Sequence, residues 1–513
     1  MDQGLGYWLT KREMISGQRL AVVDRHKRFT YKELNRRCNR LANALRDSGV
    51  RPGDRVCSLL QNGHEQLELI FAAAKLGAIY LPINFRLTVP EIEYIVTDSG
   101  AQTFLYHDEF AHLAEGLEKV VSFKKTVYCG RSTTCDDEAE YEAFLDAASD
   151  EEINATVHED DVALLMYTSG TTGRPKGAML THANHMANVN HTTQRLPIHA
   201  DTIALGVTPM FHIGGTSVTV LPTLYQGGTV VTLPAFDPIA VLELTEKEKL
   251  TALFCVPSMW QMIVEELEKK DFDLSSVEFL MTGAAPTPMN ILKFFQARNL
   301  SIYEGFGMTE MAPLVAILDK WDCERKNGSV GYPAFHVDIR IIDDNGKDLP
   351  ATQVGEIICR GPNMLKGYWN KPEATAEALK GGWYHSGDLG YLDDEGYLYV
   401  VDRKKDMIIS GGENVYPAEL EQAIYLHEAV AEVAVIGLPH EKWQEVPAAC
   451  VVLKKGASMT EEDLIAFCNE RLARFKVPKT AFFIDELPKS GAGKILKTEL
   501  RKTFGGITVA AKD

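Results

Sequence analysis

The sequence predicts an α/β protein with a large N-terminal domain and a small α+β domain at its C-terminal end. Three observations lead to this fold class. The chain has 513 residues, 45% of them hydrophobic, which is too long for one ordinary domain and ample for a large core. From about Asp161 onward, short apolar strands, glycine-rich loops and amphipathic helices follow one another. After about Val401 this pattern gives way to a shorter mixture of strands and helices.

The alternation of strands and helices is clearest in the middle of the chain. LTALFCV, residues 250–256, is an apolar strand, and Pro257 suits the first turn of the helix that follows it. VEFLMT, residues 277–282, is a second strand, and the next helix has Thr287 as its expected cap. Such alternation indicates mainly parallel sheets with flanking helices, and a β-rich part completes the large domain. Because ligands bind beyond the carboxyl ends of parallel strands, we expect the glycine-rich loops to converge on one crevice.

The C-terminal segment has its own order of elements. VDRKKDMII, residues 401–409, is a charged turn between apolar strands. The elements expected after it are a helix at 416–426, strands at 431–438 and 447–454, a helix at 461–472, a strand at 480–487 and a last helix. Composition therefore divides the chain into an N-terminal domain, residues 1–402, and a C-terminal domain, residues 403–513.

Charge and composition exclude several classes of protein. The formal net charge of −18 argues against nucleic acid as a partner, because nucleic-acid binding needs a basic surface. The nine cysteines form no CxxC pair and no metal-ligand spacing, which indicates a reducing compartment. The N-terminus lacks the order of a signal peptide, VAAKD is no peroxisomal signal, and no apolar run approaches the roughly 18 residues of a transmembrane helix. A cytoplasmic enzyme is expected, while peripheral membrane contact and the oligomeric state stay open.

A polar, glycine-rich stretch, YTSGTTGRPKGAML, follows an apolar strand-like segment at residues 167–180. Phosphates are bound by hydroxyl donors, by backbone N–H groups that approach closely at glycines, and by lysine. The residues of these types are Thr168, Ser169, Gly170, Thr171, Thr172, Gly173 and Lys176. The spacing is not that of a Walker loop. Composition leaves a surface loop as the alternative, and the position after a strand favours a phosphate site.

The stretch GFGMTE, residues 305–310, combines a flat side chain with oxygen ligands. Phe306 stands between glycines, where a purine could stack on its ring. Thr309 offers a hydroxyl, and Glu310 offers the carboxylate that hard metal ions prefer. Taken alone, these residues fit equally an aromatic of the core and an ordinary surface carboxylate.

Three further residues have a functional and a structural interpretation. Asp388, in HSGDLG, would accept hydrogen bonds from both hydroxyls of a ribose if the stretch forms a tight turn, whereas a plain hairpin is the alternative. Lys494 ends a glycine-rich loop about where a helix starts, a place where the helix dipole disfavours a cation unless it meets an anion. A solvated lysine-rich tail remains the alternative there. His212, in FHIGG, fits a packed histidine better than a catalyst.

Together the motifs resemble the signatures of the adenylate-forming superfamily, which includes acyl-CoA synthetases, aryl-CoA ligases, peptide-synthetase adenylation domains and beetle luciferases. YTSGTTGRPKG, GFGMTE, GWYHSGDLG, VDRKKDMIISGGENVYPAELE and KSGAGKILKTELR occur here in one order. The resemblance covers nearly the whole chain. Judged by DRKKDMIISGGENVYPAELE and KLGAIYLPINFRLT, the chain is most similar to bacterial fatty-acid–CoA ligases.

The resemblance implies a reaction in two steps. A carboxylate attacks the α-phosphate of ATP bound with Mg²⁺, which gives an acyl-adenylate and pyrophosphate. The sulfur of coenzyme A then attacks the acyl carbon, and AMP leaves. ATP, Mg²⁺, coenzyme A and a carboxylic acid are thus the implied ligands, and catalysis rests on positioning and on charge neutralisation.

The resemblance also implies roles for residues of each motif. The loop from Thr168 to Lys176 would hold the β- and γ-phosphates. In the large domain, the implied roles are α-phosphate contact for Thr309, Mg²⁺ ligation for Glu310, adenine stacking for Phe306 beside Gly305, an adenine wall for Gly283, Ala284 and Ala285, ribose binding for Asp388 and Arg403, and gating of the acyl pocket for His212. In the small domain, Lys494 would bridge the α-phosphate and the substrate carboxylate.

The small domain is implied to be mobile, rotating about Lys405 between the two steps. This rotation would remove Lys494 from the site and bring Ser410, Gly411 and Gly412 toward the pantetheine channel.

Two residues of this chain depart from the pattern of the family. Glu304 occupies a position where relatives often carry Gln, which puts its polar contact in doubt, and Ile409 stands where plant coumarate ligases and luciferases carry Lys.

The leading hypothesis is an AMP-forming CoA ligase for a medium- or long-chain fatty acid. A ligase for an aryl acid, of the hydroxycinnamate or benzoate type, is the nearest alternative. An adenylating module that loads a carrier protein is an alternative of another class. A non-catalytic nucleotide-binding protein is disfavoured by the intact Lys494, Glu310 and the loop from Thr168.

Overall fold

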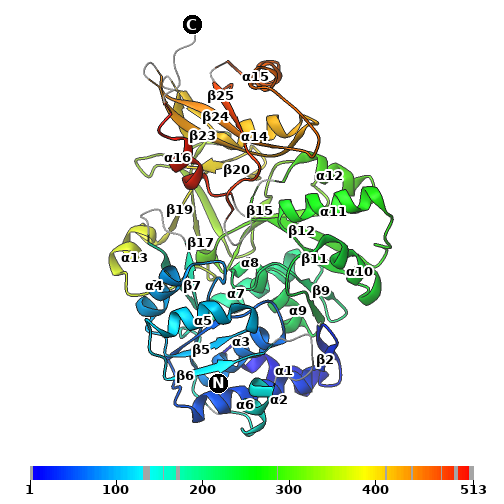
Figure 1. Cartoon of the computed structure of the whole chain (residues 1–513), viewed down its shortest axis with the longest axis vertical. Coiled ribbons are helices and arrows are strands. Elements are labelled where there is room, and N and C mark those ends of the chain that lie inside the picture. Colours follow the sequence, from blue (N-terminus) through cyan, green and yellow to red (C-terminus); the bar gives the residue numbers. More distant parts are fainter. Residues whose placement is uncertain are drawn as a thin grey trace.

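The computed structural model describes residues 4–130, 139–153, 155–168, 174–285, 287–410, 413–440, 443–474, 476–489 and 495–507. Figure 1 shows a large lobe below and a small lobe above it, joined after strand β20. The large lobe holds three sheets and the small lobe holds one. This confirms the predicted fold class. The predicted boundary between residues 402 and 403 falls in the last residues of β20 and stays a prediction.

The first sheet of the large lobe has nine strands in the order β15-β14-β13-β12-β11-β9-β10-β1-β2. The inner strands, in the order β13-β12-β11-β9-β10-β1, pair in parallel. Strand β2 at one edge and strands β14 and β15 at the other edge pair antiparallel. Their bounds are β1 Leu20–Asp24, β2 Lys27–Thr30, β9 Ile203–Gly206, β10 Thr229–Thr232, β11 Ala252–Phe254, β12 Phe279–Gly283, β13 Ile302–Gly307, β14 Leu314–Leu318 and β15 Tyr332–Pro333.

The second sheet has seven strands in the order β18-β8-β7-β4-β3-β5-β6. It is parallel from β6 to β7, while β8 and β18 are antiparallel. The bounds are β3 Arg55–Leu59, β4 Ile79–Pro82, β5 Thr103–Tyr106, β6 Lys125–Tyr128, β7 Val162–Thr168, β8 Lys176–Thr181 and β18 Gly367–Tyr368. The two large sheets confirm the predicted mainly parallel architecture.

The remaining two sheets form the β-rich part and the small lobe. The β-rich part is the antiparallel sheet β16-β17-β19-β20, with bounds Asp338–Ile342, Gly355–Arg360, Tyr384–Leu392 and Leu398–Arg403. The small lobe holds β21 Ile408–Ser410, β22 Glu413–Val415, β23 Val430–His440, β24 Gln444–Leu453 and β25 Thr480–Phe483. The predicted charged turn at 401–409 is confirmed, because β20 ends at Arg403 and β21 starts at Ile408.

Helices cover the sheets and separate them. In chain order the α-helices are α1 Tyr7–Ser16, α2 Tyr31–Asp47, α3 His64–Leu76, α4 Val89–Ser99, α5 Ala111–Glu118, α6 Ala139–Asp146, α7 His182–Arg195, α8 Ile213–Ser217, α9 Val220–Gln226, α10 Pro238–Glu248, α11 Pro257–Lys269, α12 Met289–Gln296, α13 Pro372–Ala378, α14 Pro417–Tyr425, α15 Glu461–Asn469 and α16 Lys497–Phe504. The 3-10 helices are η1 Asp108–Phe110, η2 Thr309–Met311 and η3 Lys380–Gly382. None of the described helices is long and apolar enough to cross a membrane.

About half of the α-helices begin with a side-chain cap or with a proline in the first turn. Pro257 is the first residue of α11, as predicted. The predicted cap Thr287 is wrong, because α12 begins at Met289 with Pro288 as its N-cap and has no side-chain cap bond. Proline fixes its own φ near the value that a helix entry needs, so Pro288 starts the helix without the hydroxyl of Thr287.

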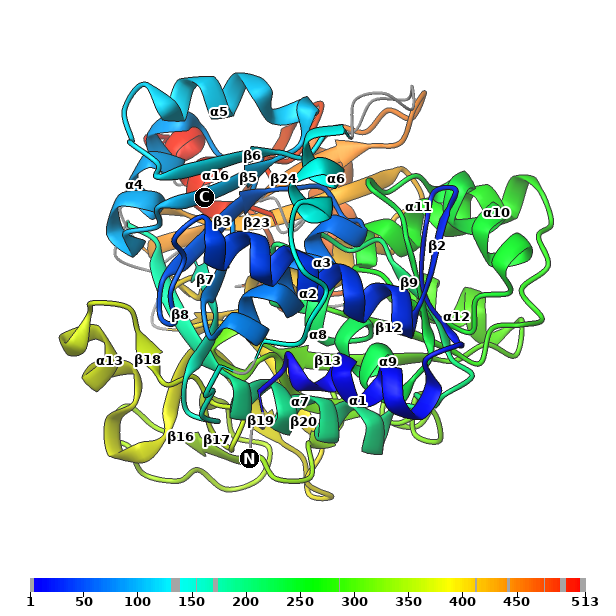
Figure 2. The same ribbon diagram turned by 90° about the horizontal axis from the view of Figure 1, so that it is seen from below.

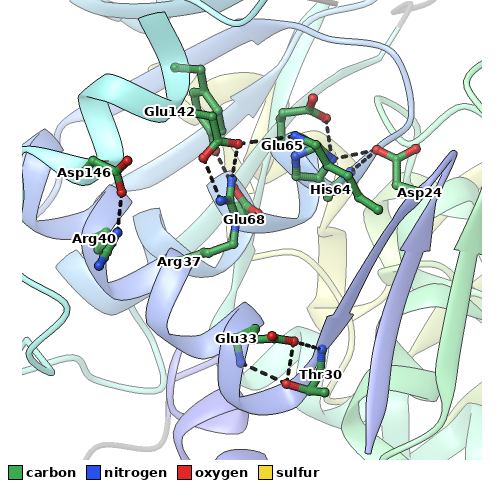
Figure 3. Close-up of polar contacts among 12 residues, drawn as sticks. Asp24, Thr30, Glu33, Arg37, Arg40, His64, Glu65, Glu68, Glu142 and Asp146 are labelled. Atoms are coloured by element: carbon green, nitrogen blue, oxygen red, sulfur yellow. Dashed lines mark hydrogen bonds and ion pairs between the residues drawn. The ribbon is translucent and has the colours of Figure 1, made fainter. Parts of the chain in front are cut away.

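Helix α3 lies between the two large sheets and is buried along its whole length, because it contacts β1 of one sheet and β4 and β7 of the other. Helices α1, α2 and α3 pack side by side across the base of the large lobe (Figure 2). The start of α2 is fixed by a capping box in which the Thr30 hydroxyl and the Glu33 carboxylate exchange bonds with each other's backbone N–H (Figure 3).

A buried ion network ties α2 to α3 and α6. The Arg37 guanidinium donates to Glu68 at 2.6 Å and to Glu142 at 2.8 Å (Figure 3). Glu68 is fully buried and also accepts a bond from the Tyr141 hydroxyl at 2.6 Å. The network therefore depends on one cation that faces a carboxylate without access to water.

We expect Arg37→Ala to lower the free energy of unfolding by about 3–5 kcal/mol, because it leaves the Glu68 charge buried and uncompensated. Urea unfolding followed by circular dichroism measures this change. Arg40→Ala is the control, since Arg40 pairs with Asp146 on the surface of the same helix pair, and it should cost at most about 1 kcal/mol. Equal effects of the two substitutions would contradict the assignment.

Candidate active site

The glycine-rich stretch at 167–180 is the connection of a β-hairpin. Thr168, the last residue of β7, pairs with Lys176, the first residue of β8. Residues Ser169, Gly170, Thr171, Thr172 and Gly173 lie outside the described residues. The stretch thus returns as a strand before α7 begins, and does not pass directly from strand to helix as the recurring pattern predicted. The pairing brings the hydroxyl of Thr168 and the ammonium of Lys176 to the same end of the hairpin.

Helix α4 supports both ends of this connection. The Tyr167 hydroxyl donates to Asp98 at 2.7 Å, and the Tyr94 hydroxyl donates to the carbonyl oxygen of Pro175 at 3.2 Å. Asp98 also accepts a bond from Lys371 at 2.8 Å. The ends of the connection are therefore fixed by side chains that no motif of the sequence had indicated.

Glu310 lies next to Thr168 although 142 positions separate them along the chain. The Thr168 hydroxyl donates to Oε1 of Glu310 at 3.3 Å, and the Tyr368 hydroxyl donates to the same oxygen at 2.9 Å. Glu310 is 8% exposed and belongs to the short 3-10 turn η2. The alternative of an ordinary surface carboxylate does not hold for this residue.

Gly283 and Gly305, which are expected from the sequence to lie near adenine, allow two strands to approach closely. Gly283 at the end of β12 pairs with Gly305 of β13. A Cβ atom on Gly283 would lie 2.9 Å from the carbonyl oxygen of Gly305, which is closer than such atoms normally come. Ala284 follows with φ of 71°, a left-handed conformation that is unusual for alanine. Ala285 is exposed, and Phe306 is half-buried in β13 opposite Ala316.

Asp388 and Arg403 form an ion pair between neighbouring strands. They stand opposite each other on β19 and β20, with 3.3 Å between Nε of Arg403 and Oδ1 of Asp388. The predicted tight turn at HSGDLG is wrong, because residues 384–392 form one strand. Gly387 with φ of 68° and a register shift after Leu389 bend this strand, so a bulge and not a turn presents the carboxylate.

Asp388 and Glu310 lie near the same buried thiol. Burial and then the charges of Asp388 and Glu310 raise the pKa of Cys359 to about 12. Glu310, in the turn after β13 of the first sheet, and Asp388, in β19 of the third sheet, are thus near each other in space. None of the eight cysteines among the described residues forms a disulfide.

Burial shifts the pKa values of His212 and Glu304 in the direction that favours their neutral forms. Burial, with a smaller effect from the Arg86 charge, lowers the pKa of His212 to about 4. Its Nε2 is buried and has no hydrogen-bond partner among the residues that the structure describes. Burial raises the pKa of Glu304 to about 7. Since side chains alternate along β13, Glu304 faces away from the side of the sheet that Gly305 borders.

The small-lobe residues are placed only in part. Lys405 is exposed in the turn between β20 and β21, and Ser410 is buried at the end of β21. Gly411, Gly412 and Lys494 lie outside the described residues. The residues that flank the last segment, Lys489 and Ile495, pair with each other as an isolated bridge.

The residue types around Glu310 suit a hard divalent cation. Carboxylate and hydroxyl oxygens from Glu310, Thr168 and Thr309 are the donors that Mg²⁺ prefers. Tyr368, Asp98 and Tyr94 escaped the sequence analysis, because single tyrosines and a helix aspartate carry no spacing that marks a site.

Comparison with known proteins identifies the two parts of the chain. Residues 11–369 match the family described as AMP-binding enzyme, and residues 419–494 match the AMP-binding enzyme C-terminal domain. A feruloyl-CoA synthase of Amycolatopsis sp is 45% identical over 504 residues, covering 98% of this chain and all of the relative. The long-chain-fatty-acid–CoA ligase FadD13 of Mycobacterium tuberculosis is 36% identical over 506 residues, covering 98% and 99%.

Solved structures agree with the family match. The crystal structure of ATP-bound MatB from Rhodopseudomonas palustris superposes with a TM-score of 0.91 at 32% identity, covering 99% of each chain. ATP and coenzyme A fit as substrates of such a protein. The chain therefore belongs to the AMP-binding enzymes, and it is an AMP-forming acid–CoA ligase.

Proposed function

We propose that the protein converts an aryl acid of the hydroxycinnamate type to its CoA thioester through an aryl-adenylate. The observation that carries this proposal is the difference in identity over nearly the same length, 45% to the feruloyl-CoA synthase against 36% to the fatty-acid ligase. The motifs alone favoured a fatty acid, and that preference is now the weaker of the two hypotheses. The motifs are assigned to ATP and coenzyme A, which fatty-acid and aryl-acid ligases share, so they carry little information on the acid.

Side chains between His212 and the adenine wall support a flat substrate. A Cβ atom on Gly214 would lie 3.6 Å from the ring of Phe254, and one on Gly283 would lie 4.0 Å from the same ring. Phe211, beside His212, packs edge-on against Phe85. Rings and glycines together make a wall that suits the face of an aromatic acid.

The remaining assignments are proposals from the motifs. The connection from Thr168 to Lys176 binds the outer phosphates, Asp388 and Arg403 bind the ribose, and Phe306 stacks on adenine. Glu310 holds Mg²⁺, whose charge offsets that of the phosphates. Lys494 then neutralises charge between the substrate carboxylate and the α-phosphate during adenylation.

Rotation of the small lobe about Lys405 brings Ser410, Gly411 and Gly412 to the thiol of coenzyme A for the second step.

A panel of acids tests the substrate class. We expect kcat/KM for ferulate or coumarate to exceed that of every fatty acid from eight to sixteen carbons by about tenfold or more, because a wall built for a ring is only partly filled by an alkyl chain. Pyrophosphate release, measured with and without coenzyme A, gives both half-reactions. A fatty acid at the head of the panel would restore the first hypothesis.

A further inference from the structure

We propose that Tyr368 is a positioning residue of the metal and phosphate site, whose hydroxyl orients the Glu310 carboxylate and whose ring supports Lys176. This inference rests on the proposed role of Glu310 and goes beyond it. Tyr368 belongs to none of the motifs that marked the site. It is the second residue of β18, a strand of only two residues at the edge of the second sheet.

Backbone hydrogen bonds hold Tyr368 and its neighbour in place. Tyr368 pairs with Ala178 of β8, and its backbone N–H donates to the Thr375 hydroxyl at 2.9 Å. The backbone N–H of the next residue, Trp369, donates to the carbonyl oxygen of Gly177 at 2.8 Å. The side chain is 8% exposed. The short strand therefore holds the tyrosine against β8, the strand that begins with Lys176.

The two oxygens of the Glu310 carboxylate differ in their hydrogen bonding, and the Tyr368 hydroxyl contributes to this difference. Tyr368 and Thr168 both donate to Oε1, whereas Oε2 receives no hydrogen bond from any residue in the described part of the chain. A carboxylate that is fixed through one oxygen can present the other to a cation in a defined direction. Hydrogen bonds of this kind to a metal ligand orient it and tune its affinity.

Tyr384 lies beside Tyr368 as a second buried tyrosine. The two hydroxyl oxygens are 3.4 Å apart. Tyr384 thus adds a second buried hydroxyl behind the first, with Tyr368 as the one that contacts the carboxylate.

The ring of Tyr368 links the carboxylate to the lysine. The ammonium of Lys176 lies 5.4 Å from the ring centroid, within the range of a cation–π contact. One side chain therefore touches the proposed metal ligand with its hydroxyl and the proposed phosphate-binding cation with its face. These two residues lie 134 positions apart in the chain, so a common support can keep the positive and negative parts of the site in register.

Tyr368→Phe tests the inference, because it removes the hydroxyl and keeps the ring. We expect the affinity for Mn²⁺ in the presence of ATP, measured by the electron paramagnetic resonance signal of free Mn²⁺, to fall by about 10- to 100-fold. The KM for Mg·ATP should rise, and the KM for coenzyme A should stay unchanged. A tyrosine that served only the packing would leave the Mn²⁺ affinity at the wild-type value.

Tyr141→Phe is the matched control, since Tyr141 is buried and donates to the buried Glu68 in the same way, far along the chain from the motifs. It should lower stability without changing Mn²⁺ affinity. Glu310→Gln separates two kinds of failure. If Glu310→Gln abolishes Mn²⁺ binding and Tyr368→Phe does not weaken it, the role of Tyr368 is refuted and that of Glu310 stands. If neither variant weakens Mn²⁺ binding, both assignments are refuted.

Discussion

Lys494→Ala is expected to slow adenylation by on the order of 10²–10³ or more, and to leave thioester formation from a synthetic acyl-adenylate near its wild-type rate. The proposed role explains the asymmetry between the two steps. Negative charge builds up between the carboxylate and the α-phosphate only in the first step, so an ammonium at this place stabilises only that transition state. Carboxylate-dependent exchange of pyrophosphate into ATP measures adenylation, and thioester formation from the adenylate is followed separately.

Lys489→Ala is the control for Lys494→Ala. Lys489 stands five positions earlier in the same lysine-rich stretch and forms an ion pair with Glu432 of the small lobe. The substitution removes one positive charge close in sequence to Lys494, so general electrostatic attraction of ATP would be affected alike. We expect little change in either step for this variant. Equal loss of both steps in Lys494→Ala would show that the lysine, or the rotation of the small lobe, is misassigned.

Sequence patterns predicted the architecture because they follow from short-range chemistry. Apolar strands that alternate with amphipathic helices can bury their faces only in layered α/β sheets, and the structure has these sheets. The composition change after Val401 marked the small lobe, whose elements occur in the predicted order. Of the expected nucleotide-binding residues, Thr168, Glu310 and Lys176 gather around one tyrosine.

Other features depend on contacts that no local pattern encodes. The HSGDLG stretch has the composition of a turn, but pairing with β17 on one side and β20 on the other extends it as a strand. Tyr368 is an ordinary aromatic residue in the sequence, and only the pairing of β18 with β8 brings it to Glu310. Thr287 has the side chain of a cap, but Pro288 after it already fixes the start of the helix. In each case tertiary contact or a neighbouring residue overrides local preference.

Glu310→Gln is expected to reduce adenylation by on the order of 10²-fold or more, because the substitution removes the charge that holds the divalent cation and keeps the shape of the side chain. The loss should be largest at low Mg²⁺ and smaller at high Mg²⁺, since mass action compensates for a weakened ligand. Initial rates of pyrophosphate release, measured over a series of Mg²⁺ concentrations at saturating ATP, give the apparent affinity of the metal.

Glu304→Gln is the matched control for Glu310→Gln, because it makes the same chemical change six positions earlier, within the strand β13 and not in the turn η2 that holds Glu310. In the wild-type protein, burial raises the pKa of the Glu304 carboxyl from 4.5 to about 7. Between these two pH values the folded protein therefore keeps a proton on Glu304 that the unfolded chain releases. Stability is therefore expected to fall as pH rises from about 4.5 through about 7, and Glu304→Gln should remove that decline without changing the Mg²⁺ dependence. A shift in Mg²⁺ dependence of equal size in both variants would show that lost negative charge in general, and not a metal ligand, accounts for the effect at Glu310.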